Sequence, residues 1–358
     1  MSSNTGIKFG VQLSCRWLYP INDSIETFVL ADKLGFDSIW VGDHLAFEHG
    51  EKILDTWMTL AFVANKSKKA MIGTAVTDPH RRHPAILAQM GTTLDILSSG
   101  RFIMGIGAGQ AMNLDPYGIL WNNPLSRMTE SIELLKKFWT DEKIDYNGKY
   151  FHIRDAYLEP KPIQKPHPPI WIGGTSKNTL KLIGKKGDGW LPGGSSPKIY
   201  NENCNIIKKW SQKNGRNDDE IVYGVLLPTA ISSDYNKARR YIENTTKEAL
   251  LNDPKTLEKM GVISNANELS RFRESKLVFT PQTTIDFQDV ASRIPFDMVK
   301  SRSVFGTPDD CIDQIEKYIE AGANHIIVRP QSKSPKIRKK FLKTYHEKIL
   351  PYFFKNQK

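Results

Sequence analysis

The stretch "ADKLGFDSIWVGDHLAF", residues 31–47, joins a helical pattern directly to a buried strand. Gly35 lies where a helix would end, and the apolar run 38–41 that follows has the length of a strand covered on both faces. Two ionisable residues, Asp43 and His44, come immediately after this strand. A helix that turns straight into a strand is the join that proteins with parallel sheets repeat. The stretch therefore predicts an α/β fold with parallel strands, and it places two charged residues at the end of one strand.

The rest of the chain repeats this unit. We expect strands near residues 7–13, 37–42, 70–76, 101–107, 169–174, 187–192, 221–231 and 325–330. Amphipathic helices are expected near residues 22–34, 55–65, 84–97, 124–139, 176–185, 197–213, 234–251 and 307–321. Eight strands that alternate with helices in 358 residues predict an α/β fold, a (β/α)8 TIM barrel with insertions, in which residues 1–358 form one domain.

The start of the last predicted helix supports this assignment independently. Thr307-Pro308-Asp309-Asp310 provides a capping side chain, a proline at the first helical position and an acid at the third. Gly322 is placed to end the same helix.

Two segments do not follow the alternation. Residues 142–160 contain Asn147-Gly148 between alternating apolar positions, which predicts a hairpin insertion. Residues 252–304 form a long polar and mixed segment, and structureless loops of that length are uncommon in compact domains. We expect this segment to be a lid over the active site with substrate contacts, or else an oligomer contact.

The composition excludes several classes of protein. Hydrophobic residues make up 39% and charged residues 25%, as in soluble globular proteins. No signal-peptide pattern opens the chain, and no apolar run is long enough for a membrane span, so we expect a cytoplasmic protein without membrane contact. The three cysteines are widely separated, which predicts neither disulfides nor a metal site. The net charge of +11 comes from dispersed lysines and short clusters such as 336–340, which indicates a solvated basic surface or an anionic small ligand rather than nucleic acid.

The carboxyl ends of the strands are where a barrel of this kind places its active site. The first strand ends at Gln12, Ser14 and Cys15, the second at Asp43 and His44, and the eighth at Arg329. The third, fourth and fifth lead into residues 73–84, 105–113 and 173–176.

Two glycine clusters follow these strands. Gly173-Gly174-Thr175-Ser176 opens a helix, so its backbone N–H groups could hold a phosphate, although a plain tight turn would use the same residues. Gly105, Gly107 and Gly109 alternate, which permits close approach of a flat ligand ring or of another backbone segment. The pattern lacks the strand and helix context of a dinucleotide fingerprint.

His44 is the first candidate for acid–base chemistry, because a histidine exchanges its proton near neutral pH. A carboxylate beside it would raise its pKa, but adjacent strand residues face opposite sides, so Asp43 and His44 need not touch. A structural histidine remains the alternative. His80 and His83 are expected at the helix entry and near an anion rather than on a metal, since no carboxylate cluster accompanies them.

Several motifs together resemble a known group. "GFDSIWVGDHL", "IGTAVTDPHRRHPAILAQMGTTLDILSSGRFIMGIGAG", "PPIWIGGTS", "KKGDGWLPGG" and "FGTPDDCIDQIEKYIEAGANHIIV" span nearly the whole chain. They are similar to the bacterial-luciferase-like superfamily, and within it to oxidoreductases that use the deazaflavin coenzyme F420. Phthiodiolone ketoreductase-type and methylenetetrahydromethanopterin reductase-type members show the most similar patterns.

The resemblance implies roles for individual residues. Asp43 and His44 match the pair that contacts the deazaflavin ring and supplies the acid–base histidine, and Ala75-Val76 matches a non-proline cis peptide bond behind the ring. Gln110 stands where the sugar-phosphate dehydrogenases of this branch have a glutamate, and an amide can only hydrogen-bond, which disfavours glucose-6-phosphate activity. The catalytic residues expected are thus His44, Asp43 and Gln110. The expected cofactor-binding residues are Asp43, Ala75, Val76, Thr77, Gly107, Ala108, Gly109, Asn113, Gly173 and Gly174.

The main functional hypothesis is hydride transfer between coenzyme F420 and a carbonyl or imine-type substrate, such as one resembling methylenetetrahydromethanopterin. His44 would donate a proton or stabilise a developing anion, and Asp43 would orient it or bind the ring. Arg81 and Arg82 would favour the coenzyme's anionic groups. One alternative is an FMN-dependent luciferase-like monooxygenase, and another is a flavin- or F420-binding protein without turnover. The resemblance also implies a homodimer or higher homo-oligomer.

Overall fold

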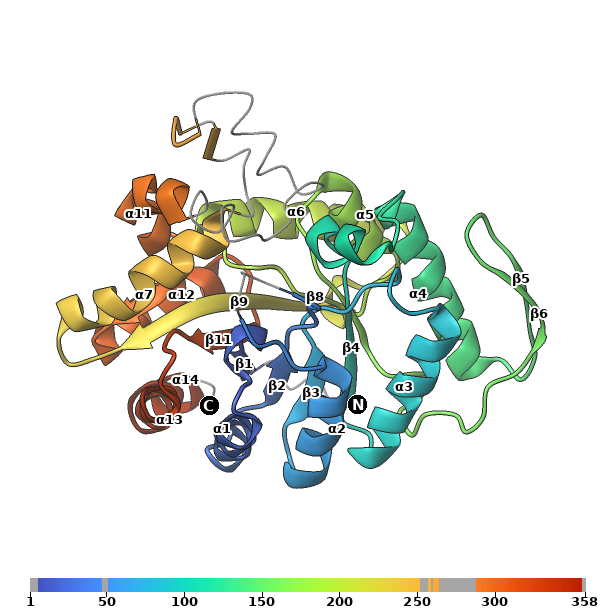
Figure 1. Cartoon of the computed structure of the whole chain (residues 1–358), viewed down its shortest axis with the longest axis horizontal. Helices are drawn as coiled ribbons and strands as arrows, with labels where there is room; N and C mark the ends of the chain where they lie inside the picture. Colours follow the sequence, from blue (N-terminus) through green and yellow to red (C-terminus); the bar gives the residue numbers. More distant parts are fainter. Residues whose placement is uncertain (1–5, 47–50, 252–256, 259, 264–287, 356–358) are drawn as a thin grey trace.

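The computed structural model describes residues 6–46, 51–251, 257–258, 260–263 and 288–355. Within them, eight parallel strands form a closed barrel surrounded by helices (Figure 1). Each strand pairs with the next along the chain, and pairing between the last and the first closes the ring. The predicted TIM barrel is confirmed. Its strands are β1 (Lys8–Leu13), β2 (Ser38–Val41), β3 (Met71–Thr74), β4 (Phe102–Ile106), β7 (Ile170–Ile172), β8 (Gly189–Trp190), β9 (Val222–Ile231) and β11 (His325–Pro330).

The interior of the barrel is filled with side chains. Trp40 of β2 and Trp171 of β7 lie with ring centroids 4.9 Å apart, in a cluster with Ile103 of β4, Leu226 of β9 and Ile327 of β11. A larger apolar cluster lies between the strands and the helices. Because side chains fill the interior, a ligand of the barrel binds at the ends of the strands rather than inside the barrel.

The helices around the barrel begin and end where the sequence predicts. Gly35 and Gly322 have positive φ angles of 85° and 106° just beyond two of the helices. Thr307 and Asp310 form the predicted capping box. The eight predicted helices are α1 (Ile21–Lys33), α2 (Thr56–Lys66), α3 (Pro84–Leu97), α4 (Pro124–Thr140), α5 (Lys177–Lys186), α6 (Pro197–Lys213), α7 (Tyr235–Leu250) and α12 (Pro308–Glu320). Short 3₁₀ turns lie at Cys15–Trp17, Ala111–Asn113, Asp115–Tyr117 and Asp218–Glu220.

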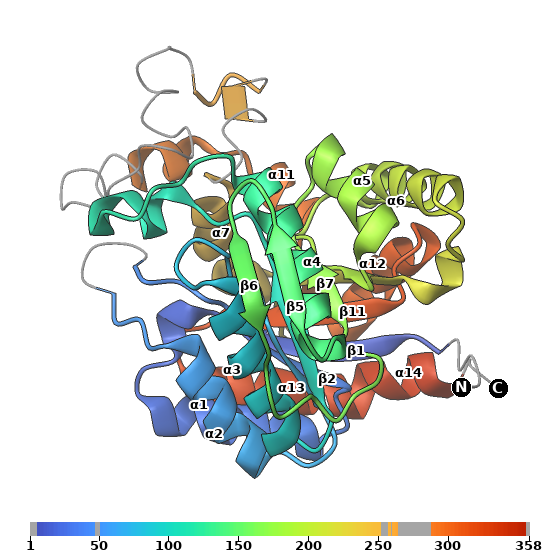
Figure 2. The same ribbon diagram turned by 90° about the vertical axis from the view of Figure 1, so that its right-hand side faces the viewer.

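The segment predicted to form a hairpin carries β5 (Ile144–Asn147) and β6 (His152–Ala156), which pair antiparallel. The hairpin lies on the outer side of α4 (Figures 1 and 2). Its loop covers residues 148–151, so the connection is longer than a two-residue Asn-Gly turn. The carboxylate of Glu130 in α4 accepts hydrogen bonds from the backbone N–H groups of Lys149 and Tyr150 and so holds this loop against the helix.

Much of the expected lid, residues 252–304, lies outside the described residues. Its described part includes α11 (Phe296–Lys300) and the first residue of β10 (Val304–Gly306). The sequence does not predict β10, which pairs parallel with the last residues of β9.

The chain continues beyond β11 in α13 (Pro335–Thr344), a π-helical turn (Tyr345–Ile349) and α14 (Leu350–Lys355), none of which the sequence predicts. The basic cluster 336–340 lies on α13. The expectation of a solvated surface is wrong for Arg338, which is 1% exposed and donates hydrogen bonds to the carbonyls of Ser332 and Lys333.

Candidate active site

His44 follows β2 and is held by Asn113, which lies 69 residues further along the chain. The Asn113 Nδ2 atom lies 3.0 Å from His44 Nδ1. Its Oδ1 atom accepts hydrogen bonds from the backbone N–H groups of Leu45 (2.8 Å) and Ala46 (3.1 Å). Since a carbonyl oxygen must face these two donors, the amide nitrogen of Asn113 must face the histidine.

This contact determines where His44 carries its proton. An amide nitrogen only donates, so Nδ1 accepts and the proton of the neutral imidazole lies on Nε2. Burial lowers the pKa of His44 to about 4, against a smaller opposing effect of Asp43. His44 is therefore neutral at physiological pH, and the expected rise in its pKa caused by Asp43 does not prevail.

Asp43 points to other partners. Its carboxylate accepts hydrogen bonds from Thr77 Oγ1 (2.7 Å), Arg81 (3.1 Å) and Arg82 (2.9 Å). Arg81 also pairs with Asp78 at 2.5 Å, and Arg82 with the more exposed Asp55 at 3.1 Å. The positive charges of Arg81 and Arg82 are thus already matched by carboxylates, which argues against the prediction that they attract the coenzyme's anionic groups.

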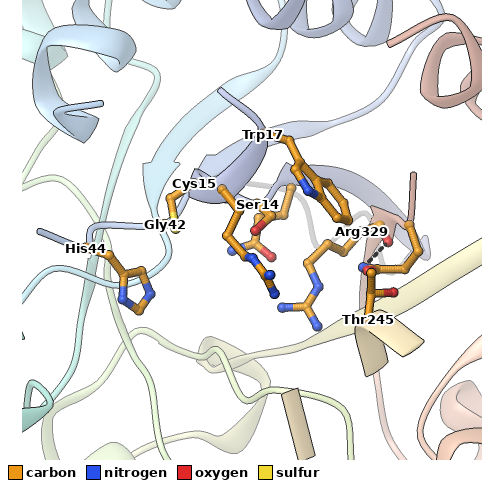
Figure 3. Close-up of a pocket in the computed structure, with 10 residues that line it drawn as sticks. Ser14, Cys15, Trp17, Gly42, His44, Thr245 and Arg329 are labelled. Carbon is orange, nitrogen blue, oxygen red and sulfur yellow. Dashed lines mark hydrogen bonds between the residues drawn. The ribbon is translucent and has the colours of Figure 1, made fainter. Parts of the chain in front are cut away.

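A pocket of about 70 Å³ lies beside His44 at the carboxyl ends of the strands. Figure 3 shows His44 on one side of this pocket and Arg329, from β11, on the other. Its polar groups include Gln12, Arg16, His44, Thr245, Arg329 and Gln331. Of the three residues that the sequence predicts as catalytic, His44 lines this pocket, whereas Asp43 and Gln110 do not.

Contacts within the protein explain the glycines at positions 105 and 107. A Cβ atom on Gly105 would overlap the Thr74 carbonyl oxygen, and one on Gly107 would lie 2.5 Å from Val76 Cγ2. Gly173 faces the same valine, at 3.1 Å from its Cγ1. The sequence predicts that these glycines admit either a flat ligand ring or a neighbouring segment of the chain. The structure shows the close approach of a neighbouring segment. The predicted cis peptide bond between Ala75 and Val76 is also present.

The loop after β4 contains buried polar atoms that lack partners. Gln110 Oε1 and His80 Nε2 have no hydrogen-bond partner among the described residues. The two side chains flank Gly109, which has a φ of +78° and would place a Cβ atom 3.4 Å from the His80 ring. Ala108, between Gly107 and Gly109, accepts a hydrogen bond from Trp121 through its carbonyl.

The turn at Gly173-Gly174 leads into α5. Gly174 is exposed and has a φ of +120°, and Ser176 caps the helix through the backbone N–H of Thr179. The turn therefore has the geometry of a helix entry. Its binding of a phosphate stays a prediction.

Sequence reasoning names Gln12 and Arg329 as strand ends without assigning them a role, and does not name Arg16, Thr245 or Gln331. Arginine at the carboxyl end of a barrel strand is the signal that could have identified Arg329. The remaining three come from a 3₁₀ turn, a helix and a loop, which no local pattern links to His44.

The described residues contain neither a cluster of metal-ligating side chains nor a disulfide bond. No group of three potential metal-ligating side chains gathers there. Cys15, Cys204 and Cys311 are buried and free. His83, considered at the helix entry, caps α3 by accepting a hydrogen bond from the backbone N–H of Ala85. None of the described helices is both long and apolar enough to cross a bilayer.

A filled parallel barrel with a pocket and a neutral histidine at the carboxyl ends of its strands has the architecture of a TIM-barrel enzyme. The model of the luciferase-like monooxygenase family matches residues 8–325. The chain belongs to this family, as its motifs predict.

Individual relatives are oxidoreductases. The chain is 27% identical to the F420-dependent glucose-6-phosphate dehydrogenase of Microbacterium testaceum, over 96% of this chain and 97% of that protein. It is 29% identical to the 5,10-methylenetetrahydromethanopterin reductase of Archaeoglobus fulgidus, over 90% and 92% of the two chains. The phthiodiolone/phenolphthiodiolone dimycocerosates ketoreductase of Mycobacterium bovis is 26% identical, over 93% and 95%.

A solved structure supports the fold. The F420-dependent secondary alcohol dehydrogenase in complex with an F420-acetone adduct superposes with a TM-score of 0.81 and 24% identity, covering 96% of this chain and 98% of that chain.

Proposed function

We propose that the protein is an oxidoreductase that uses coenzyme F420 and transfers a hydride between the deazaflavin and a carbonyl or imine-type carbon of a small substrate. Relatives that cover nearly the whole chain carry this coenzyme in their names, which supports the proposal. The observation in the structure that carries it is the Asn113–His44 contact, because it presents a neutral imidazole with its proton on Nε2 beside a pocket.

The residues at the mouth of the barrel fit a large polar coenzyme. Gln110 Oε1 and His80 Nε2 are buried and have no hydrogen-bond partner among the described residues, and such atoms are satisfied by ligands or water. When bound, the deazaflavin supplies or accepts the hydride, and it does not activate oxygen readily. Thr77, Gly107, Ala108, Gly109, Asn113, Gly173 and Gly174 are the proposed lining, with Ala75 and Val76 behind the ring.

His44 acts as a hydrogen-bond donor in this proposal. Complete loss of its Nε2 proton would leave an imidazolate, which is unfavourable, so the proton stays on the ring. A neutral imidazole can still stabilise the negative charge that develops on a carbonyl oxygen during reduction, as preorganised donors do. Of the two predicted roles, stabilising an anion therefore agrees with the geometry better than donating a proton.

Asp43 takes a positioning role. It holds Thr77 and the two arginines at the start of α3, so it fixes the loop between β3 and α3 rather than His44. Gln110 is left to accept a hydrogen bond from substrate or coenzyme, since its amide cannot exchange a proton.

The test follows reduced F420 by absorbance while a panel of ketones, aldehydes and cyclic imines is added. His44→Asn should reduce kcat/KM by about 10²–10³-fold, the effect of losing one preorganised donor, while the affinity for the coenzyme is retained. His152→Asn, in the exposed hairpin, serves as the matched control and should behave as the unmodified protein. Unchanged turnover in His44→Asn would indicate a protein that binds coenzyme without catalysis, and oxygen consumption with reduced FMN would indicate a monooxygenase.

A further inference from the structure

Arg329 is a cation at the pocket, and no acidic side chain of the described residues forms an ion pair with it. Its buried Nε atom has no hydrogen-bond partner among these residues. The titratable groups that act on it are Cys15 and Arg16. Burial raises the pKa of the Cys15 thiol to about 12, so this neighbour is neutral, and the charge of Arg16 is already paired with Glu51 and Glu248. A buried guanidinium in such surroundings is unfavourable unless a ligand compensates it.

Two other arginines of the described chain donate hydrogen bonds within the protein, although the Nε atom of Arg338, like that of Arg329, has no partner there. Arg16 donates from Nε to both oxygens of Glu51, at 2.6 and 2.7 Å, and from a terminal nitrogen to Glu248 at 2.8 Å. Arg338 donates to the carbonyls of Ser332 and Lys333. Burial lowers the pKa of Arg329 and of Arg338 to about 10, but of these two only Arg338 donates side-chain hydrogen bonds to other described residues.

The space in front of Arg329 is small. The pocket of about 70 Å³ holds a carboxylate or phosphate group with a few further atoms, but not the whole of a coenzyme. Ser14 and Thr245 bring hydroxyl groups to the same pocket, and Gln331 an amide. Such groups can donate hydrogen bonds to an oxyanion.

We propose that this pocket binds an anionic group of the substrate, a carboxylate or a phosphate monoester, and that Arg329 is its main contact. That this anionic ligand is part of the substrate rests on the proposed function. Arg329 is among the charges that act on His44, so a group bound to it lies within electrostatic range of the imidazole. The substrate class is therefore a small carbonyl compound that carries a carboxylate or phosphate near the carbon that is reduced.

The first experiment uses inorganic phosphate as the probe and thermal unfolding as the readout, with chloride at equal ionic strength as the reference. Phosphate should raise the unfolding midpoint of the unmodified protein by a few degrees, because it binds the folded state alone. Arg329→Gln should unfold at a higher temperature than the unmodified protein without phosphate, and should not respond to phosphate, since the uncompensated cation is gone. Arg329→Lys, which keeps the charge, should retain a weaker response.

Arg338→Gln is the matched control. It removes a buried guanidinium that is hydrogen-bonded, so its midpoint should fall while its response to phosphate remains. An equal response to phosphate in the unmodified protein and in Arg329→Gln would overturn the proposal. So would an Arg329→Gln variant that is destabilised as strongly as Arg338→Gln, because Arg329 would then be structural.

A second titration separates substrate from coenzyme. The affinity for F420 should be the same with and without saturating phosphate, whereas competition would assign the anion site to the coenzyme and reject the substrate subsite. The phosphate response needs no coenzyme. A protein that binds phosphate through Arg329 but does not bind F420 would therefore refute the proposed function and leave the anion site standing.

Discussion

Asn113 determines which nitrogen of His44 carries the proton, although the two residues are distant in the sequence. Asn113→Asp would keep an acceptor for the N–H groups of Leu45 and Ala46 and would place a second carboxylate oxygen at His44 Nδ1. We expect the imidazole proton to move to Nδ1 and the pKa of His44 to rise by about 1–3 units, the effect of a close carboxylate. Histidine ring signals followed by NMR during a pH titration measure both changes, with His44→Asn used to assign the signal.

Activity provides the second readout of Asn113→Asp. The variant should lose turnover at pH values where the imidazole is neutral, because Nε2 would no longer donate. If the pKa of His44 and the turnover both stay as in the unmodified protein, Asn113 does not fix the histidine.

Two histidines make stability depend on pH. Burial lowers the pKa of His44 to about 4 and that of His325 to about 3. In the unfolded chain both return to about 6.5, so the unfolded state binds more protons as the pH falls from about 6.5 towards 4, and the free energy of unfolding decreases. His44 contributes about 3 kcal/mol to this decrease.

Urea unfolding at a series of pH values tests this dependence. His44→Gln should show a shallower loss of stability over that pH range than the unmodified protein. Parallel curves for the two proteins would mean that His44 is protonated as readily in the folded state as in the unfolded one.

The close packing of strand β4 against strand β3 depends on Gly105. A Cβ atom there would overlap the Thr74 carbonyl oxygen of the neighbouring strand, so Gly105→Ala must displace one of the strands. We expect a loss of about 1–3 kcal/mol in the free energy of unfolding, as for other overpacked sites. Gly193→Ala is the control, since its Cβ atom would meet no atom within 4 Å. Equal stabilities of the two variants, measured by urea unfolding, would show that the strands adapt without cost.

Most elements could be predicted because their signals are local. The capping box at Thr307 and the stop at Gly35 each depend on residues close in the sequence. β10 was missed because a strand of three residues pairs only with the end of β9, and no periodicity marks so short a segment. α13 and α14 could not be predicted because they follow the eighth strand, where the alternation of strands and helices has ended.

The position of the candidate site could be predicted from the sequence, but the contacts of its residues could not. His44 and Arg329 could be placed at the mouth of the barrel because they end strands. Their partners could not be predicted, since the Asn113–His44 contact joins residues 69 positions apart and Arg16 pairs with Glu248, 232 positions away. Such contacts follow from closure of the barrel, which no local pattern encodes.

At the scale of the whole molecule, we propose a homodimer that uses the outer faces of α2 and α3. Met58 and Phe62, one turn apart on α2, are 74% and 53% exposed, and Ile86 and Leu97 on α3 are also exposed. Met58 and Phe62 are neighbours on one face of α2, and large apolar side chains exposed together indicate an interaction surface. Light scattering after size-exclusion chromatography should give a dimer for the unmodified protein and a monomer for Met58→Glu/Phe62→Glu. A dimer that survives both substitutions would place the interface elsewhere.

The central claim, that the barrel binds coenzyme F420 for hydride transfer, is tested most directly by an equilibrium titration with F420 and with FMN. We expect a micromolar dissociation constant for F420 and binding of FMN that is at least about ten-fold weaker, a difference of about 1.4 kcal/mol. No detectable binding of F420, or tighter binding of FMN together with oxygen consumption by the reduced complex, would contradict it.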